Sequence, residues 1–334
     1  MDVLSDVITV MRTGQPRSAR VAWHAPWAQR FASVPGAAGF QIVLQGSCWL
    51  LLPDADPVPL AAGDVVFRPH GRGHTLADNP ATPPAPACDP SDPQALQRYA
   101  TGTVGTPAGA GIPATVTLCG AYELDPARAH PLLDDLPELI RLPAHLGRHP
   151  ELRATVDLLA TELERPRLGT DAIIPALLDT LLLHILRTWL DQNPTPATTG
   201  WAAALNDPAT TAALQAIHRD PARPWTVATL AAEAGLSRAP FARRFTTLLG
   251  QPPLSYLTWW RMTTAARLLR ESDAPLRIIA QQAGYSSEVA LAAAFKRQYG
   301  LTPGRYRRDS TNRFTRSSRT DHTRRDHHPL ESFV

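Results

Sequence analysis

Four side chains in the N-terminal part of the sequence could bind a metal ion or another effector: His24, Cys48, His74 and Cys119. Imidazole nitrogen and thiolate sulfur are ligands that zinc and copper ions prefer in proteins. The alternative is a structural role, because free cysteine commonly behaves as a small buried hydrophobe. The sequence therefore leaves open whether this region holds a metal ion, and it predicts no other cofactor.

The chain has three cysteines, which cannot all pair with one another and so argue against a disulfide-stapled secreted fold. Cys88 lies in a proline-rich stretch, where a basic neighbour that lowered the pKa of its thiol would favour oxidation. Its immediate neighbour is Asp89, which has the opposite effect. Redox sensing by one of the three cysteines is therefore a second alternative.

Residues 206–308 contain an internal repeat, which predicts two similar helical units. The segment 226–237 recurs 49 residues later as 275–286, with Gly235 matching Gly284. Each unit has the pattern of a short helix, a glycine that permits a tight turn, a serine that can cap the next helix, and that second helix. This order is the signature of a helix-turn-helix, and here it occurs twice.

A long helix is expected over 254–270, between the two units, because its apolar residues fall on one helical stripe. Two second helices held apart at a fixed separation could enter successive major grooves, about 34 Å apart on one face of DNA. Arg243 is the best candidate for reading a base, since arginine can bond O6 and N7 of guanine together; a phosphate contact is the alternative. The residues expected at this DNA surface are Ser237, Arg238, Ala239, Ala242, Arg243, Arg244, Ser286, Ser287, Val289, Ala292, Ala293, Lys296 and Arg297.

Residues 206–308 resemble the DNA-binding domain of the AraC/XylS family of transcription regulators. The residues that carry the resemblance include Leu230-Ala231, Gly235-Leu236-Ser237, Phe241 to Phe245, Ile279-Ala280, Gly284-Tyr285, Phe295 and Gly300 to Pro303. The resemblance implies a bacterial regulator whose first domain senses an effector and whose second domain binds promoters.

The second of the two reading helices departs from that family. Members of the AraC/XylS family often carry arginine or another polar residue where this chain has Val289, Ala292 and Ala293. We therefore expect this helix to contribute thymine-methyl contacts, and to anchor phosphates through Lys296 and Arg297.

Short apolar runs broken by glycine and proline predict β-strands over 40–67 and 114–124, in a sandwich or a barrel. The stretch 63–74 resembles the second signature of the cupin β-barrels, Gly-x5-Pro-x-Gly-x2-His, which implies that His74 points inward. Residues 40–52 lie where the first cupin signature would fall, but they lack the His-x-His that supplies two metal ligands. Gln41 occupies that neighbourhood instead. The resemblance supports a cupin-type sensor domain and leaves its metal in doubt.

Residues 149–191 have apolar residues at helical spacing and predict two helices, each with one apolar stripe. Dimerisation or coupling through these stripes and packing within the first domain are both open. The expected divisions are a cupin-like sensor domain at 1–145, a helical coupling or dimerisation segment with its linker at 146–200, a double helix-turn-helix domain at 201–310, and a disordered tail at 311–334. A proline-rich loop or disordered insertion is expected at 79–113.

The net charge of +3 conceals two parts of opposite sign. Residues 1–200 carry 14 arginines against 20 acidic residues, a net −6, whereas 201–334 carry 18 arginines and Lys296 against 10 acidic residues, a net +9. A basic second part is typical of a domain that binds a polyanion such as nucleic acid. No apolar run reaches the roughly 18 residues of a membrane span, and no signal-peptide pattern opens the chain, so we expect a cytoplasmic protein with no membrane partner.

These patterns predict a multidomain α+β protein with an N-terminal cupin-like β-barrel, a helical linker and a C-terminal all-α double helix-turn-helix domain. The predicted function is a sequence-specific transcription regulator and not an enzyme. Its expected partners are double-stranded DNA, an effector (a small molecule, a metal or an oxidant), a second copy of the chain in a homodimer, and RNA polymerase if it is an activator. The alternative is a cupin metallo-enzyme, such as a dioxygenase or an isomerase, with an accessory DNA-binding domain.

Overall fold

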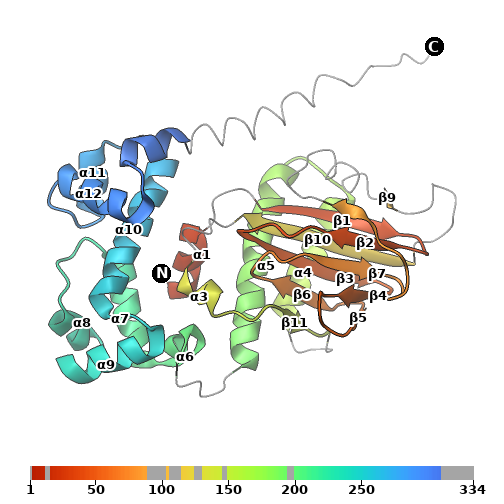
Figure 1. Ribbon diagram of the computed structural model, residues 1–334, viewed down its shortest axis with the longest axis horizontal. Helices are drawn as coiled ribbons and strands as arrows, with labels where there is room; N and C mark the ends of the chain where they lie inside the picture. The colour runs from red at the N-terminus through yellow and green to blue at the C-terminus, as the bar shows by residue number, and fades with distance from the viewer. Residues whose placement is uncertain are drawn as a thin grey trace, which may run out of the picture. The chain divides into compact units, whose positions relative to one another are not determined.

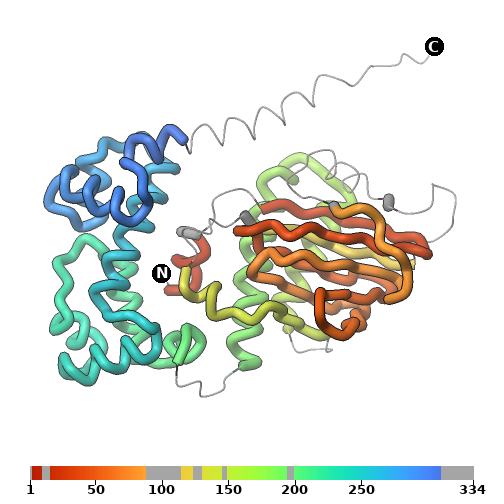
Figure 2. The backbone as a smooth tube through the Cα atoms, viewed as in Figure 1, coloured from red at the N-terminus to blue at the C-terminus, as the bar shows by residue number. Residues whose placement is uncertain are grey.

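The computed structural model describes residues 2–11, 16–88, 103–104, 114–123, 130–144, 149–193 and 199–309. The chain divides into two compact units (Figures 1 and 2): one comprises Val7–Ala203, and the other comprises Met1–Asp6 with Ala204–Val334. The first unit holds the described strands, and the second is helical. Most of the expected proline-rich loop, the side chain of Cys88, much of the linker and the expected tail lie outside the described residues.

The first unit is a sandwich of two β-sheets. Its strands are β1 (Arg17–Trp23), β2 (Ala28–Phe31), β3 (Ala37–Gln45), β4 (Ser47–Leu51), β5 (Val58–Ala61), β6 (Val65–Arg68), β7 (His74–Ala77), β8 (Ala85–Cys88), β9 (Thr103–Val104), β10 (Thr115–Glu123) and β11 (Ile140–Leu142). One sheet has the order β11-β6-β3-β10-β1-β9, and the other has the order β5-β4-β7-β2-β8. Among the described strands no hydrogen-bonded pair joins the two sheets, so the expected barrel is instead an open sandwich.

Strand β3 shows how the sequence produces two buried faces. Alternate residues of a strand point to opposite sides of its sheet. Gln41 and Val43 are on the side that faces the second sheet, where Val43 joins a core cluster, whereas the ring of Phe40 lies 5.7 Å from that of Tyr122 on the other side. Both sides are buried, which explains why β3 is almost continuously apolar rather than alternating.

Helices cover the outer side of the six-stranded sheet. The helices of the first unit are α3 (Pro131–Asp134), α4 (Pro150–Glu164) and α5 (Thr170–Gln192), together with the part of α1 (Val3–Met11) that begins at Val7. The hydroxyl of Tyr122 donates to the carbonyl of Leu178, which ties β10 to α5 at 2.6 Å. The apolar stripe of α5 is buried inside the unit, at Leu178, Leu181, Leu182, Ile185 and Leu186. Of the two alternatives left open by the sequence, dimerisation or coupling and packing within the first domain, this burial corresponds to packing within the domain.

By length and composition α5 could also cross a membrane, since its most apolar window has a mean hydropathy of 1.5. The expectation from apolar runs did not identify this helix, because charged and polar residues interrupt it. The leucine stripe is buried inside the unit, whereas 33% of that apolar window is buried in all.

The second unit contains two helix-turn-helix units joined by a long helix (Figure 1). Its helices are the part of α6 (Trp201–Asn206) that begins at Ala204, then α7 (Pro208–Arg219), α8 (Val227–Glu233), α9 (Arg238–Leu249), α10 (Pro253–Glu271), α11 (Leu276–Gln282) and α12 (Glu288–Tyr299). Pairs α8–α9 and α11–α12 are the two repeats that the sequence predicts. At 1.5 Å per residue, the 19-residue α10 spans about 28 Å.

The turns between the paired helices differ in their capping. Gly235 and Gly284 have φ values of +65° and +74°, the left-handed conformation that the repeat predicts for both. The hydroxyl of Ser287 accepts a hydrogen bond from the amide of Ala290 at 3.1 Å and so caps α12. Ser237 makes no such bond at the start of α9, so the expected cap is wrong for the first helix-turn-helix, α8–α9.

Candidate functional site

Helix α9 presents a basic outer surface because its apolar residues are buried on the opposite side. Phe241 and Phe245 are buried in the core of the second unit, as the sequence predicts. Arg238 and Arg243 are exposed, and neither has a hydrogen bond or an ion pair within the described part of the chain. Their guanidinium groups are therefore available to an external acceptor.

Arg244 differs from its neighbour because it is bound within the protein. Its Nε donates to Oδ1 of Asp207 at 2.7 Å, while Oδ2 of the same carboxylate accepts from the amide of Thr210 at 2.8 Å and caps α7. Burial alone would raise the pKa of Asp207, but the hydrogen bonds from Arg244 and Thr210 outweigh it and lower this pKa. Arg244 therefore holds α9 against α7, a role that the sequence did not reveal.

Helix α12 has a different outer surface. Leu291 and Phe295 are buried, whereas the side chain of Val289 is 74% exposed. Lys296 and Arg297 are exposed and have no polar partner among the described residues. Helix α9 thus exposes Arg238 and Arg243, whereas α12 exposes the apolar Val289 together with Lys296 and Arg297 in its last turn.

Every residue of the expected DNA surface is exposed or partly exposed. Other arginines of the second unit are bound to the protein itself. Arg261 donates to the carbonyl of Pro221 at 2.7 Å, Arg270 to the hydroxyl of Tyr306 at 3.0 Å, and Arg307 to the carbonyl of Ala274 at 2.6 Å. Composition alone does not separate these structural arginines from the free ones.

In the first unit, His74 lies in a cluster with Gln41 and Arg68. The terminal amide of Gln41 is 3.3 Å from Nε2 of His74, so the structure places Gln41 beside this histidine. Nη1 of Arg68 is 2.8 Å from Nδ1, and the Phe31 ring stacks on the imidazole at 4.8 Å. Burial and the charge of Arg68 lower the pKa of His74 to about 3, so the imidazole is neutral at physiological pH.

The four proposed metal ligands are not brought together. Cys48 and Cys119 belong to a hydrophobic cluster, His74 belongs to the polar cluster above, and His24 lies between β1 and β2. Within the described ranges, no group of three His, Cys, Asp or Glu side chains is placed to hold a metal ion. The guanidinium of Arg68 also repels a cation at His74. The residues present therefore do not fit the cupin metal.

The buried cysteines are poorly suited to thiolate chemistry. Burial, together with the charge of Asp64, raises the pKa of the Cys48 thiol to about 12. The Cys119 sulfur is 3.6 Å from the carbonyl of Ala19, to which it donates. A thiol with a raised pKa reacts slowly with oxidants, because the thiolate is the reactive form.

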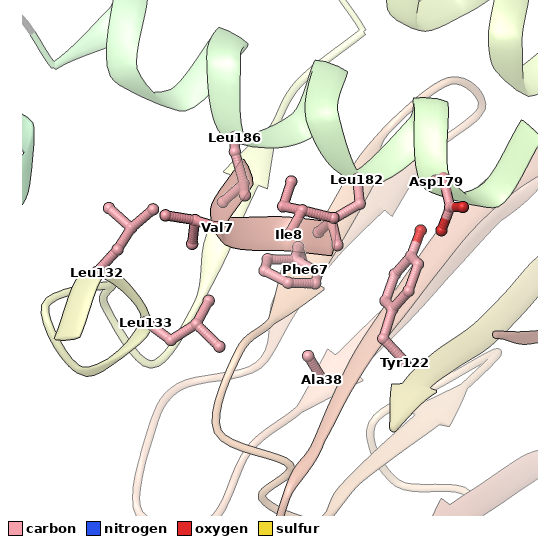
Figure 3. Close-up of a pocket in the computed structure, with 10 residues that line it drawn as sticks. All are labelled: Val7, Ile8, Ala38, Phe67, Tyr122, Leu132, Leu133, Asp179, Leu182 and Leu186. Carbon is pink, nitrogen blue, oxygen red and sulfur yellow. The ribbon is translucent and has the colours of Figure 1, made fainter. Parts of the chain in front are cut away.

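A small hollow lies between α5 and the outer side of the six-stranded sheet (Figure 3). Its cavity volume is about 20 Å³, room for about one water molecule, and its lining is almost entirely apolar: Val7, Ile8, Ala38, Phe67, Tyr122, Leu132, Leu133, Asp179, Leu182 and Leu186. The nearly continuous apolar run of β3 signals a sheet that is buried on both sides. It does not signal the hollow, which depends on helices distant in sequence.

The two units match two different family models. A model described as cupin matches residues 2–191, and one described as a helix-turn-helix domain matches residues 230–309. An AraC-like transcription regulator of Streptomyces lividans is 36% identical over 93% of this chain and 99% of that relative. The HTH-type transcriptional regulator AlkR of Acinetobacter baylyi is 31% identical over 93% of this chain and 100% of the relative.

Among solved structures, the DNA-binding domain of AdpA, a global transcriptional factor in complex with a target DNA, is 38% identical to this chain. The match covers 32% of this chain and 96% of that domain, with a TM-score of 0.30. The near-full-length match to the Streptomyces regulator covers both units, in the order cupin and then helix-turn-helix. The chain therefore belongs to the AraC-like transcription regulators, with a cupin domain preceding a helix-turn-helix domain.

Proposed function

We propose that this regulator reads promoter DNA through α9 and α12, which enter successive major grooves, and that an effector bound to its cupin domain controls the reading. The observation that carries the proposal is the free pair Arg238 and Arg243 on the outer surface of α9, in a duplicated helix-turn-helix whose second copy exposes Lys296 and Arg297. Charged donors without internal acceptors are suited to phosphates and base edges.

The two helices have different tasks in this proposal. Arg243 donates to O6 and N7 of a guanine, because its guanidinium is exposed and has no internal acceptor. Val289 contacts a thymine methyl group, which accounts for an apolar side chain 74% exposed on α12. Lys296 and Arg297 bind phosphates and fix the position of α12. Specificity thus comes mainly from α9.

The relatives are named as transcription regulators, which supports a regulator over an enzyme. The alternative of a cupin metallo-enzyme finds no support in the donor set around His74. We further propose that the protein acts in the cytoplasm, as a homodimer when it binds paired sites. If it activates transcription, it contacts RNA polymerase.

The proposal is tested by measuring the affinity of the full chain for duplexes selected from a random-sequence library. Arg243→Ala should weaken binding to the selected site far more than to random DNA. Arg219→Ala is the matched control, because Arg219 is an exposed arginine on α7 rather than on a reading helix. Equal losses for the two variants, or an equal loss on selected and random DNA, would contradict base reading by Arg243.

A further inference from the structure

The Gln41–Arg68–His74 cluster contains buried polar groups without partners. Arg68 is only 5% exposed and Gln41 only 6%. Nε of Arg68 and Oε1 of the Gln41 amide have no hydrogen-bond partner among the described residues. Buried polar groups are nearly always paired, so a cluster that leaves two of them unpaired requires an explanation.

The hydrogen-bond chemistry of His74 determines how the Gln41 amide is oriented. Arginine can only donate, so Nδ1 of His74 must accept from Nη1 of Arg68. A neutral imidazole then carries its proton on Nε2, and this N–H needs an acceptor. In the structure Nε2 of Gln41 faces this nitrogen and Oε1 is unpaired; we assign the amide with these two atoms exchanged, because hydrogen-bond partners decide the orientation of any amide. The unpaired group of Gln41 is consequently its NH₂, a donor.

The Nε–Nη2 edge of the Arg68 guanidinium is free, and this edge can bind a carboxylate. Nη1 is used by the His74 ring and by the carbonyl of Arg72. No described residue accepts from the Nε–Nη2 edge, which can bind both oxygens of one carboxylate through parallel hydrogen bonds. Arg68 and Gln41 thus both have a free donor, and both contact the same imidazole.

The charge of Arg68 is only weakly compensated from nearby. Burial lowers the pKa of Arg68, the carboxylate of Glu138 raises it, and the positive charge of Arg72 lowers it further. Glu138 forms its ion pair with Arg72, at 3.0 Å, on the protein surface. His74 is neutral and adds no charge of its own. A buried guanidinium without a bonded carboxylate is costly, and an anionic ligand would remove that cost.

We propose that the Gln41–Arg68–His74 cluster binds the carboxylate of a small organic acid, and that this acid is the effector of the cupin domain. The inference rests on the proposed function in one respect, namely that the cupin domain is the sensor. Arg68 supplies the charge and the two parallel donors, and Gln41 supplies a further N–H. His74 is a positioning residue, since it holds both donors through its two ring nitrogens. The residue His74 is only partly buried, so the cluster is not sealed from solvent.

The test compares small carboxylates with their uncharged amides on the full-length protein. Acetate and lactate, at constant ionic strength, should give a saturable rise in the thermal unfolding temperature of the cupin unit, whereas acetamide and lactamide should not. Arg68→Met should weaken carboxylate binding about tenfold or more, as expected when a charge-assisted hydrogen bond is lost. Gln41→Leu keeps the charge, removes one donor and should weaken binding less. Arg30→Met, at an exposed arginine of β2, should bind carboxylates like the wild type.

Two results would overturn the inference: equal responses to carboxylates and amides, or an unchanged carboxylate response in folded Arg68→Met. If Arg68→Met fails to fold, the amide comparison and Gln41→Leu still decide the question. A response to uncharged apolar compounds alone would instead place the effector outside this cluster. Binding of selected DNA without any probe is measured in parallel. Loss of DNA binding would contradict the proposed function, whereas intact DNA binding without a carboxylate response would contradict only this inference.

Discussion

Asp207 binds Arg244 and leaves Arg243, the adjacent residue of α9, free. One carboxylate caps α7 through Thr210 and accepts from the Arg244 guanidinium, so this arginine is tied to the second unit itself. Arg243 has no such partner within the described residues and lies at the surface. Two consecutive arginines of one helix therefore have different roles, one in holding the helix and one at the DNA surface.

The first prediction separates these two roles. Arg243→Ala should reduce the affinity for the selected DNA site by about 1–3 kcal/mol and leave the unfolding temperature nearly unchanged. Arg244→Ala should lower the unfolding temperature of the helical unit, because it removes the partner of Asp207. Calorimetry and DNA titration of both variants measure the two effects. Similar profiles for the two variants would contradict the assignment.

Asp207→Ala provides the complementary test of the same relationship. It removes the N-cap of α7, which typically costs about 1 kcal/mol, and also releases Arg244. A double-mutant cycle compares the unfolding temperatures of Asp207→Ala, Arg244→Ala and the double variant. The double variant should be less destabilised than the sum of the two single variants, since both remove the same pair. Strict additivity would show that the pair does not contribute.

The second prediction concerns the two turn glycines. A Cβ added at Gly235 meets nothing within 4 Å, so Gly235→Ala should cost only the left-handed conformation, about 1–2 kcal/mol. A Cβ at Gly284 would lie 2.8 Å from the carbonyl oxygen of Pro221 and 2.9 Å from Cα of Ala222. Gly284→Ala should therefore destabilise the full chain considerably more in urea unfolding. Equal costs would show that the packing around Gly284 relaxes freely.

The third prediction is a pH dependence that originates at His74. Its pKa is about 3 in the folded chain, because burial and the charge of Arg68 disfavour the charged form, and near 6.5 when unfolded. The contribution of neutral His74 to the free energy of unfolding is complete above pH 6.5 and is lost as the pH falls toward 3. Over this range the free energy of unfolding falls by up to about 1.4 kcal/mol per pH unit. His74→Gln should flatten this slope for the cupin unit in urea unfolding, whereas the control His24→Gln should not. If the free energy of unfolding of His74→Gln depended on pH as it does in the wild type, His74 would be excluded as the source of this dependence.

The fourth prediction concerns phosphate binding by α12. Removing both charges in Lys296→Ala with Arg297→Ala should weaken binding to selected and random DNA alike. It should also reduce the salt dependence of the affinity by about two counterions, since each phosphate contact releases roughly one. Titrations at several salt concentrations measure this slope. An unchanged slope, with a loss confined to the selected site, would show that these residues read bases instead.

The double helix-turn-helix could be predicted because its signals are local. Each of these signals depends on a few consecutive residues. The glycines at 235 and 284 indicate turns, and the phenylalanines at 241, 245 and 295 indicate buried helix faces. The role of Arg244 could not be predicted, since its partner lies 37 residues away and is brought near by the packing of α7 on α9. The cap at Ser237 failed for a related reason: the residue type permits a cap, but the geometry decides it.

The cupin domain shows a similar division. The motif at 63–74 predicted an inward-pointing His74, and the structure places Gln41, which stands where the first cupin signature would have a histidine, beside it. It did not predict Arg68, which precedes the turn and returns to the same imidazole through its long side chain. Nor could it distinguish a closed barrel from two sheets, because closure depends on hydrogen bonds between edge strands far apart in sequence.

The measurement that most directly tests the central claim is a footprint of the full-length protein on DNA selected from a random-sequence library. The account predicts protection of two major-groove segments about 34 Å apart on one face of the duplex, one under α9 and one under α12. It also predicts that Arg243→Ala removes the preference at the first segment and leaves the second protected. Selection that yields no preferred sequence, or protection confined to a single groove, would contradict it.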